Sequence, residues 1–414
     1  IMMGIYLSGV RNGAPPKTDP AETIPFRRLY LHSLVRTSEG AKMSKTKGTG
    51  VDPLQLTQEN GTDALRYMLA SMAAPGTDIV LSEDRILGAR AFANKIWNAA
   101  RFLFVNLDKR EAEGFSLDDL AGFEVRAKAP YALPGAASLP HRWIFSRLAA
   151  VIAQVNDALE NFRFHEAAQA IYQFFWGDFC DWYIEWVKPQ LSATERAIAI
   201  PSWRNIFAAL DAALRLLHPV MPFLTEELWH RMPQPGGARS IGLDRFPEAS
   251  ANWADATAEA NVATLQEIIV AVRNIRAEMK LDPKRKVAAD FSSAHGEVRN
   301  LVHEQQFLVL RLGALSELRI SDKALDPVGA MIRSTAQFDV RIAYGEGVDK
   351  AAESAKTKNE IERLEKDIES KRARLADETF QSKAPENVVR NMENTLRERE
   401  IELQKMRERL KQFA

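Results

Sequence analysis

Three lysines lie close together in a short segment that also contains small hydroxyl residues and a glycine. The segment reads Lys42, Met43, Ser44, Lys45, Thr46, Lys47 and Gly48. Lysine ammonium groups supply point charges for phosphate oxygens, and glycine lets the backbone approach such a group closely. Asp52 and Pro53 predict a helix that begins just afterwards, and a helix amino terminus also favours anions. The segment is a candidate phosphate-binding loop that could neutralise a leaving pyrophosphate. Charge alone does not distinguish it from a solvated basic loop.

Histidine and cysteine offer few other reactive groups. None of the seven histidines is spaced as a metal pair, so no metal site is predicted. His32 lies in residues 28–35, which predict a short buried strand leading to the lysine segment. This position makes His32 a candidate for a role beside that segment, and a histidine buried in the core is the alternative. The single cysteine, Cys180, lies among aromatic residues and is expected to be inert core. One cysteine excludes internal disulfides and fits a reducing compartment, so a cytoplasmic location is predicted.

Length and composition bound the fold. The 414 residues predict two or three domains, and a chain with 46% hydrophobic and 27% charged residues is ordinary for a globular protein. Collagen-like and disordered chains are therefore excluded. No apolar run reaches about 18 residues, so no membrane span is expected. The 55 basic and 55 acidic residues balance, and only a local basic face could predict a nucleic-acid partner.

Residues 83–233 predict an antiparallel helix bundle. Ser82 is suited to cap a helix that reaches Asn106, and the Gly- and Pro-rich residues 108–140 predict an irregular link. Pro219 and Pro222 are expected to kink the last long helix. The other long helices are expected at residues 140–159, 163–187 and 202–231.

Aromatic residues are dense within this predicted bundle. For any one of them a packed core position is expected, and stacking on unpaired RNA bases is the functional alternative. They are Phe162, Phe164, Phe174, Phe175, Trp176, Phe179, Trp182, Tyr183 and Trp186.

A different organisation follows the bundle. A helix is predicted over residues 255–280, where Arg273 and Arg276 lie three apart on one face. They could contact phosphate, and a surface ion-pair role is the alternative. Residues 285–345 predict a small α+β module with one helix. Its strands are expected at residues 287–291, 318–321 and 338–344.

The last 60 residues carry a sparse heptad seam of apolar residues. Lys371 and Arg399 interrupt the seam, and a break at residues 379–387 divides it, so a two-helix antiparallel hairpin is predicted. The seam consists of Ile361, Leu364, Ile368, Leu375, Val389, Met392, Leu396, Leu403, Met406 and Leu410. A basic cluster lies on the first helix, and a solvated coiled-coil flank is the alternative reading. The cluster consists of Lys371, Arg372 and Arg374.

The order of residues 42–46 resembles the KMSKS loop of class I aminoacyl-tRNA synthetases, with Thr46 where serine is usual. The surrounding residues are similar to the valyl type, although Ser33 stands where that family usually has glycine and Thr49 where it has asparagine. Further similarity runs through residues 25–32, 48–54, 61–67, 94–102, 142–144, 178–183, 217–229, 273–279 and 380–389.

The resemblance implies a mainly α fold in four parts. Residues 1–82 would be the end of a Rossmann-type catalytic domain with the lysine loop and connecting helices. Residues 83–233 would form the helical anticodon-binding bundle, and residues 234–348 a linker, a helix and the small α+β junction module. Residues 349–414 would form a coiled-coil arm that binds tRNA.

The resemblance also implies ATP-dependent charging of valine tRNA by the complete enzyme. Lys42 and Lys45 would stabilise the pyrophosphate charge, and Mg²⁺ would accompany ATP. The ATP side would include His32, Lys42, Met43, Ser44, Lys45 and Thr46. The bundle would offer an anticodon surface and the arm would touch the outer corner of the tRNA, with contacts expected at Arg273, Arg276, Lys371, Arg372 and Arg374.

Class I synthetases also need a His-x-Gly-His type motif, and the sequence contains none. The amino-acid pocket and the editing domain are missing too, so the chain resembles a carboxy-terminal half and is predicted to be catalytically incomplete. Its expected partners are valine tRNA, ATP and valine in the complete enzyme, and the missing amino-terminal half, with the chain itself a monomer. The alternatives are a free-standing tRNA-binding protein without catalysis, or an isoleucyl or leucyl relative. The coiled-coil tail favours valine.

Overall fold

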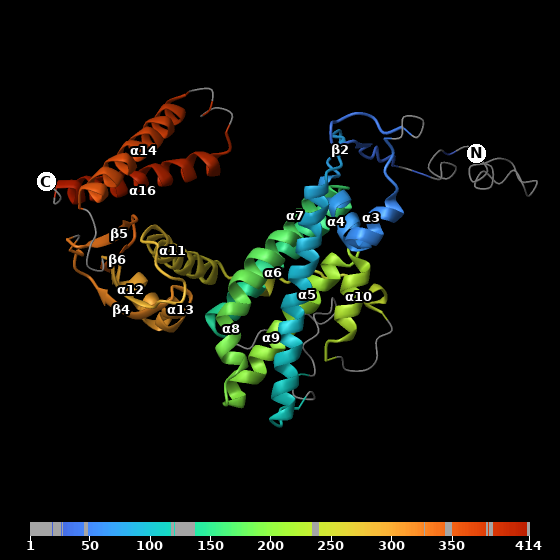
Figure 1. Ribbon diagram of the computed structural model, residues 1–414, viewed down its shortest axis with the longest axis horizontal. Coiled ribbons are helices and arrows are strands. Elements are labelled where there is room, and N and C mark those ends of the chain that lie inside the picture. Colours follow the sequence, from blue (N-terminus) through green and yellow to red (C-terminus); the bar gives the residue numbers. More distant parts are fainter. Residues whose placement is uncertain are drawn as a thin grey trace, which may run out of the picture. The chain divides into compact units, whose positions relative to one another are not determined.

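The structure is a computed structural model (Figure 1). It describes residues 19, 26, 28–44, 49–116, 120, 137–233, 240–326, 328–343, 350–377, 380 and 384–411. The chain forms two compact units, Ile1–Asp255 and Ala256–Ala414. Helices dominate both units, so the predicted mainly α fold is confirmed. Within the described residues, no helix combines the length and apolar character needed to cross a bilayer.

The first unit begins with a two-stranded parallel sheet and two short helices. Strand β1 (Val35–Arg36) pairs with β2 (Ile79–Val80). Helix α3 (Pro53–Asn60) begins as predicted, because the Asp52 carboxylate accepts a hydrogen bond from the Leu54 amide at 2.9 Å. Gly61 ends it with φ +90°, a conformation that favours glycine. Helix α4 (Thr62–Met72) follows directly.

The prediction of a buried strand over residues 28–35 is wrong. Only Val35 from that run lies in β1, and Leu29 and Leu31 are 86% and 75% exposed. A buried strand needs paired neighbours and a covering layer. Among the described residues, β2 is the only strand paired with β1, and it pairs over two residues.

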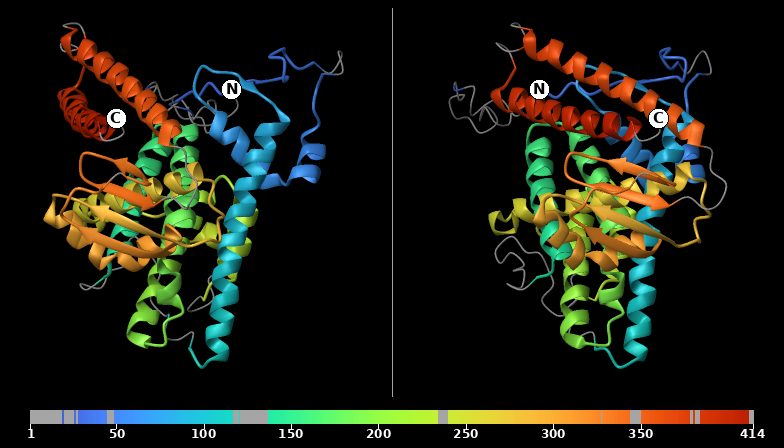
Figure 2. Two further views of the ribbon diagram at one scale, coloured as in Figure 1. Left: turned by 60° about the vertical axis from the view of Figure 1, so that its left-hand side comes forward. Right: turned by 90° about the vertical axis from the view of Figure 1, so that its left-hand side faces the viewer.

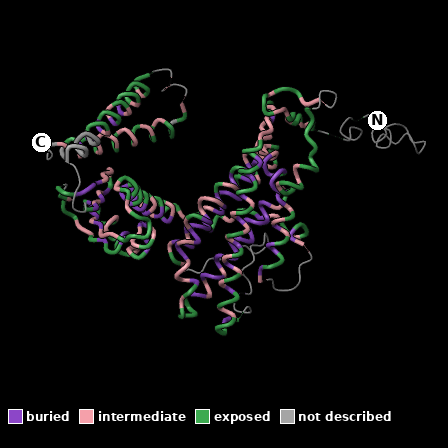
Figure 3. The backbone as a smooth tube through the Cα atoms, viewed as in Figure 1, coloured by how far each residue is buried: buried purple, intermediate pink, exposed green. Residues whose placement is uncertain are grey.

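Long helices build the bundle of the first unit (Figure 1). Every residue of α9 from Asn205 to Leu217 is buried, which makes α9 the central helix (Figure 3). The bundle helices are α5 (Glu83–Ala112), α6 (Leu139–Glu160), α7 (Phe164–Tyr172), the π-helix η3 (Gln173–Tyr183), α8 (Ile184–Leu191), α9 (Arg196–Leu217) and α10 (Pro222–His230). Two short 3₁₀ turns follow, η4 (Ile241–Leu243) and η5 (Ala251–Trp253).

The predicted limits of two bundle helices are wrong, and a third predicted helix changes its hydrogen-bond pattern along its length. Helix α5 continues beyond Asn106 to Ala112. The helix predicted at 163–187 contains a π-helical stretch, because i→i+5 bonding leaves no clear mark in the apolar spacing. The helix predicted at 202–231 is two helices, not one kinked helix. Pro222 is the first residue of α10, where its missing N–H costs nothing.

Most of the aromatic cluster forms the bundle core, as expected. Phe174, Phe175, Phe179 and Tyr183 are at most 1% exposed. Burial raises the pKa of the Cys180 thiol to about 12, which keeps it protonated and inert, as predicted.

A polar network crosses this core at His141. Its Nδ1 lies 2.8 Å from the Tyr183 hydroxyl, and its Nε2 lies 3.2 Å from the Ser202 hydroxyl. Ser202 in turn donates to the Gln190 side chain at 2.9 Å. Burial lowers the pKa of His141 to about 4, so the ring is neutral in the fold.

Lowering the pH from 7 to 5 should reduce the free energy of unfolding of the first unit by about 2 kcal/mol through His141. Histidine has a pKa of about 6.5 in an unfolded chain. Between that value and about 4 the unfolded state therefore binds the proton more tightly. The contribution is fully present above pH 6.5 and is lost as the pH falls. Urea unfolding at both pH values measures it. His141→Gln should show a weaker pH dependence, and an unchanged dependence would contradict the assignment.

The second unit joins a long helix to a small mixed sheet. Helix α11 (Ala256–Glu278) lies where it was predicted. The sheet has the order β4-β3-β6-β5, with β3 parallel to β4 and antiparallel to β6 (Figure 2). Its strands are β3 (Val287–Ser292), β4 (Leu315–Ser321), β5 (Ala330–Ser334) and β6 (Asp339–Ala343). Strand β5 was not predicted, and two short helices, α12 (Gly296–Glu304) and α13 (Gln306–Leu312), replace the single one predicted.

The chain closes with the predicted antiparallel hairpin (Figure 2). Helices α14 (Lys350–Ala376) and α16 (Glu386–Lys411) lie side by side. Their seam buries Ile361, Leu364, Ile368, Leu403 and Met406. This confirms the heptad pattern as the interface between the two helices.

Candidate functional site

The lysine-bearing segment leaves β1 through a tight turn. The Gly40 amide donates to the Thr37 carbonyl at 2.8 Å, and Gly40 has φ +79°. Lys42 then forms an antiparallel bridge with Arg36. The turn leaves the side chain of Lys42 exposed, as a phosphate-binding role requires.

Two residues close the neck of this loop. The Ser44 amide donates to the Thr49 hydroxyl at 3.0 Å, and the Thr49 amide donates to the Ser44 carbonyl at 3.1 Å. Thr49 therefore has a structural role that the sequence analysis did not predict. Met43 and Ser44 are half-buried, whereas Lys45 and Thr46 lie outside the described residues.

An ion pair anchors the strand that carries the loop. The Arg36 guanidinium hydrogen-bonds Asp78, and this contact lowers the pKa of the Asp78 carboxyl. The Asp78 carboxylate also accepts from the Leu34 amide at 3.3 Å, and the Leu81 amide donates to the Arg36 carbonyl at 3.1 Å. The start of the loop is thus fixed to residues 78–81.

His32 lines an open cleft beside this anchor. The cleft is bounded by Leu29–Leu34, Pro75–Asp78, Asn161 and Phe162. His32 is exposed and its Nδ1 lies 2.8 Å from the Ser33 carbonyl. The alternative of a core histidine is therefore wrong, and a role beside the nucleotide stays a prediction.

A polar clamp connects α4 to the start of α10. Asp63 accepts hydrogen bonds from the Leu224 amide at 2.6 Å and from the Phe223 amide at 3.4 Å. Arg66 donates to the carbonyls of Pro219 and Val220 at 2.9 and 3.0 Å. Burial raises the pKa of Asp63 above its usual value, against the lowering effect of the amides it caps. The segment after the lysine loop is thereby tied to the bundle.

The two arginines of α11 are bound to backbone carbonyls. Arg273 donates to the Leu312 carbonyl at 2.9 Å. Arg276 is 7% exposed and donates to the carbonyls of Ala314 and Asp282 at 3.0 and 3.1 Å. This geometry gives Arg276 a structural role and no open face for RNA. The expected tRNA contact of Arg273 stays a prediction.

The three basic residues of the arm have different surroundings. Lys371 donates to Asp367 at 2.6 Å, so its charge within the seam is compensated. Arg372 is 62% exposed and pairs with Glu400 on the facing helix. Arg374 stacks over the Phe380 ring at 4.9 Å. Arg372 and Arg374 are the members of this cluster that an external ligand can reach.

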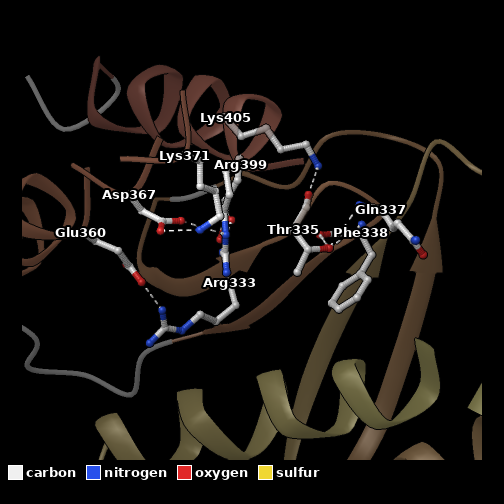
Figure 4. A network of polar contacts seen from close by, with 10 residues as sticks. Arg333, Thr335, Gln337, Phe338, Glu360, Asp367, Lys371, Arg399 and Lys405 are labelled. Carbon is white, nitrogen blue, oxygen red and sulfur yellow. Dashed lines mark hydrogen bonds and ion pairs between the residues drawn. The ribbon is translucent and has the colours of Figure 1, made fainter. Parts of the chain in front are cut away.

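Two cations fix the arm to the sheet within the second unit (Figure 4). Arg333 of β5 binds both Glu278 of α11 and Glu360 of α14. On the other arm helix, Lys405 donates to the Thr335 carbonyl at 2.9 Å. These contacts were not predicted from the sequence, because β5 was not predicted and the partners are far apart in the chain.

A metal site is not evident where the structure describes the chain. Within those ranges, no group of three His, Cys, Asp or Glu side chains is arranged to hold a metal ion.

Three families match the chain in succession. Residues 1–82 match the family described as tRNA synthetases class I (I, L, M and V). Residues 141–291 match the anticodon-binding domain of tRNA ligase, and residues 349–414 match the valyl tRNA synthetase tRNA binding arm.

Curated relatives share this arrangement over most of the chain. The valine–tRNA ligase of Solibacter usitatus is 42% identical over 92% of this chain and 41% of its own length. That of Geobacter sulfurreducens is 38% identical over 88% of this chain and 40% of its own length. That of Caulobacter vibrioides is 36% identical over 100% of this chain and 42% of its own length. The chain thus spans about two fifths of the length of these relatives. It belongs to the valine–tRNA ligase family and is homologous to the carboxy-terminal portion of its members.

Proposed function

We propose that this chain supplies the tRNA-binding modules and the pyrophosphate side of the ATP site to a valine–tRNA ligase. The observation that carries the proposal is the succession of the three matched families along one chain. The proposed parts are residues 1–82, 83–233, 234–348 and 349–414, with the roles that the resemblance implies. The match of residues 349–414 to a valyl arm favours valine over the isoleucyl and leucyl alternatives.

In the proposed reaction, valine attacks the α-phosphate of ATP, and valyl-adenylate and pyrophosphate form. Lys42 and Lys45 stabilise the charge that develops on the pyrophosphate, acting by position and charge and not by proton transfer. The exposed position of Lys42 and the neck formed by Ser44 and Thr49 support this role. Met43, Thr46 and His32 complete the ATP side, and Mg²⁺ accompanies ATP. The terminal adenosine of the tRNA then takes the valyl group.

In the proposed tRNA complex, the bundle contacts the anticodon and the arm contacts the outer corner of the tRNA. The exposed guanidinium groups of Arg372 and Arg374 support an electrostatic contact at the arm. Because the hairpin seam is closed by residues of the same chain, we propose that the chain acts as a monomer. The single buried cysteine fits a cytoplasmic location.

Equilibrium binding of the purified chain to valine tRNA tests the proposal. Affinity should fall steeply as salt rises from about 50 to 200 mM, since several cations displace counterions from phosphates. Absence of binding at the lowest salt, by a chain that is folded by circular dichroism, would contradict the proposal.

A further inference from the structure

Four exposed cationic side chains lie in the loop between α11 and β3. They are Lys280, Lys284, Arg285 and Lys286, and residues 280–286 are here called the basic loop. None of these four side chains forms an ion pair or a hydrogen bond with another residue of the described ranges. Elsewhere in the second unit, Arg333, Arg341 and Lys405 each pair with a carboxylate. Asp282 is the one acid within residues 280–286, so the basic loop carries a net positive charge.

Hydrogen bonds from the buried Arg276 side chain and within the loop itself hold the basic loop in one conformation. The Arg276 guanidinium donates to the carbonyls of Asp282 and Pro283 at 3.1 and 3.4 Å, and to the Ala314 carbonyl across the loop at 3.0 Å. Lys280 has φ +51°, and the Lys284 amide donates to the Asp282 carboxylate at 2.7 Å. A loop fixed in this way loses little conformational entropy when its cations meet a ligand.

The carboxylates around the loop are already engaged. Asp282 caps the Lys284 amide, Glu278 pairs with Arg333, and Glu317 of β4 lies 3.8 Å from Arg319. The buried charge of Arg276 adds to the positive field above it. A ligand suited to this loop carries several anionic groups at regular spacing, as a nucleic-acid backbone does.

We propose that the basic loop binds the phosphate backbone of RNA, with Arg276 as a positioning residue beneath it. The inference rests on the proposed function, because tRNA is then the RNA at hand. It assigns phosphate contact to Lys284, Arg285 and Lys286, and it gives Arg276 an indirect part in the tRNA contact that the sequence pattern predicted for it.

The test compares tRNA binding by the full chain and by the triple variant Lys284→Ala/Arg285→Ala/Lys286→Ala over a salt series. The triple variant should bind valine tRNA about tenfold or more weakly at about 0.1 M salt. The slope of log K against log salt should become shallower by about 2 to 3, because up to three counterions fewer are released. The single variants should each show a share of this loss, and they keep the test decisive if the triple variant does not fold.

Two further variants separate charge from position. Lys323→Ala removes an exposed lysine that follows the far end of β4 and should change neither affinity nor slope. Arg276→Lys keeps the charge but cannot span three carbonyls, so it should weaken binding several-fold and leave the salt slope unchanged.

Two failures are distinguishable. If the wild-type chain binds tRNA and the loop variants match it in affinity and slope, the basic loop is not a phosphate site, and the proposed function stands. If the folded wild-type chain binds no tRNA, the proposed function fails and this inference fails with it.

Discussion

Replacing Arg215 by methionine should lower the free energy of unfolding of the first unit by about 3–5 kcal/mol. Arg215 is 3% exposed and lies 2.9 Å from the Asp211 carboxylate, which is 1% exposed. Asp211 also accepts a hydrogen bond from the Trp229 indole at 2.8 Å, so the pair links α9 to α10. Without the guanidinium, a buried carboxylate loses its counter-charge. Urea unfolding of wild type and variant measures the difference.

The pH dependence of this loss identifies its cause. Burial raises the pKa of Asp211 to about 6 even with Arg215 beside it. Removal of Arg215 should raise that pKa further, so the folded variant prefers the protonated acid. Its stability therefore falls as the pH rises through that value, and the loss should be larger at pH 8 than at pH 5. A loss independent of pH would point to altered packing instead.

Matched variants test whether the buried charge of Asp211 causes the loss of stability. Adding Asp211→Asn to Arg215→Met should restore part of the stability, because no charge is then buried. Arg231 also pairs with an acid one helical turn away, Glu227, but both side chains are 53% exposed. Arg231→Met should therefore cost less than about 1 kcal/mol.

Replacing Lys42 by alanine should slow valine-dependent ATP–pyrophosphate exchange by about 10²–10³-fold in a complete valine–tRNA ligase that carries this segment. The exposed ammonium group is proposed to stabilise charge that develops as pyrophosphate leaves. The main effect should therefore fall on the rate, with a smaller change in the KM for valine. The chain alone should show no exchange, since its sequence contains no His-x-Gly-His type motif.

Two control variants accompany this experiment. Lys42→Arg keeps the charge and should restore part of the rate. Lys109→Ala removes another exposed lysine, near the end of α5, and should leave the exchange rate unchanged. Equal rates for Lys42→Ala and wild type would remove Lys42 from the proposed mechanism.

Local signals predicted many elements of this fold. Asp52, Pro53 and Gly61 bound α3 as expected, because caps depend on adjacent residues. The heptad seam predicted the hairpin, because its apolar spacing is set by one partner helix. The prediction of a buried strand over residues 28–35 was wrong, because an apolar run does not reveal whether other strands and helices cover it. Strand β5 is short and follows a turn at Val328 and Gly329, so its pairing with β6 could not be predicted locally.

The candidate site was predictable in part only. The lysine segment could be predicted from the sequence, because the residues that define it are adjacent in the chain. The clamp of Asp63 on Leu224 spans 161 positions, and no local pattern predicts such a contact. The spacing of Arg273 and Arg276 placed them on one helical face, which indicated a surface position for Arg276. Its burial depends on the loop from Asp282 and on Ala314, which tertiary packing brings together.

Competition binding tests whether this chain recognises valine tRNA. Valine tRNA, the same tRNA with its anticodon replaced, and isoleucine tRNA would compete for the purified chain at fixed salt. Valine tRNA should bind more tightly than both competitors, and the binding of all three should weaken as salt rises. Equal affinity for all three would contradict recognition of valine tRNA, because only sequence-independent phosphate contacts would then be made.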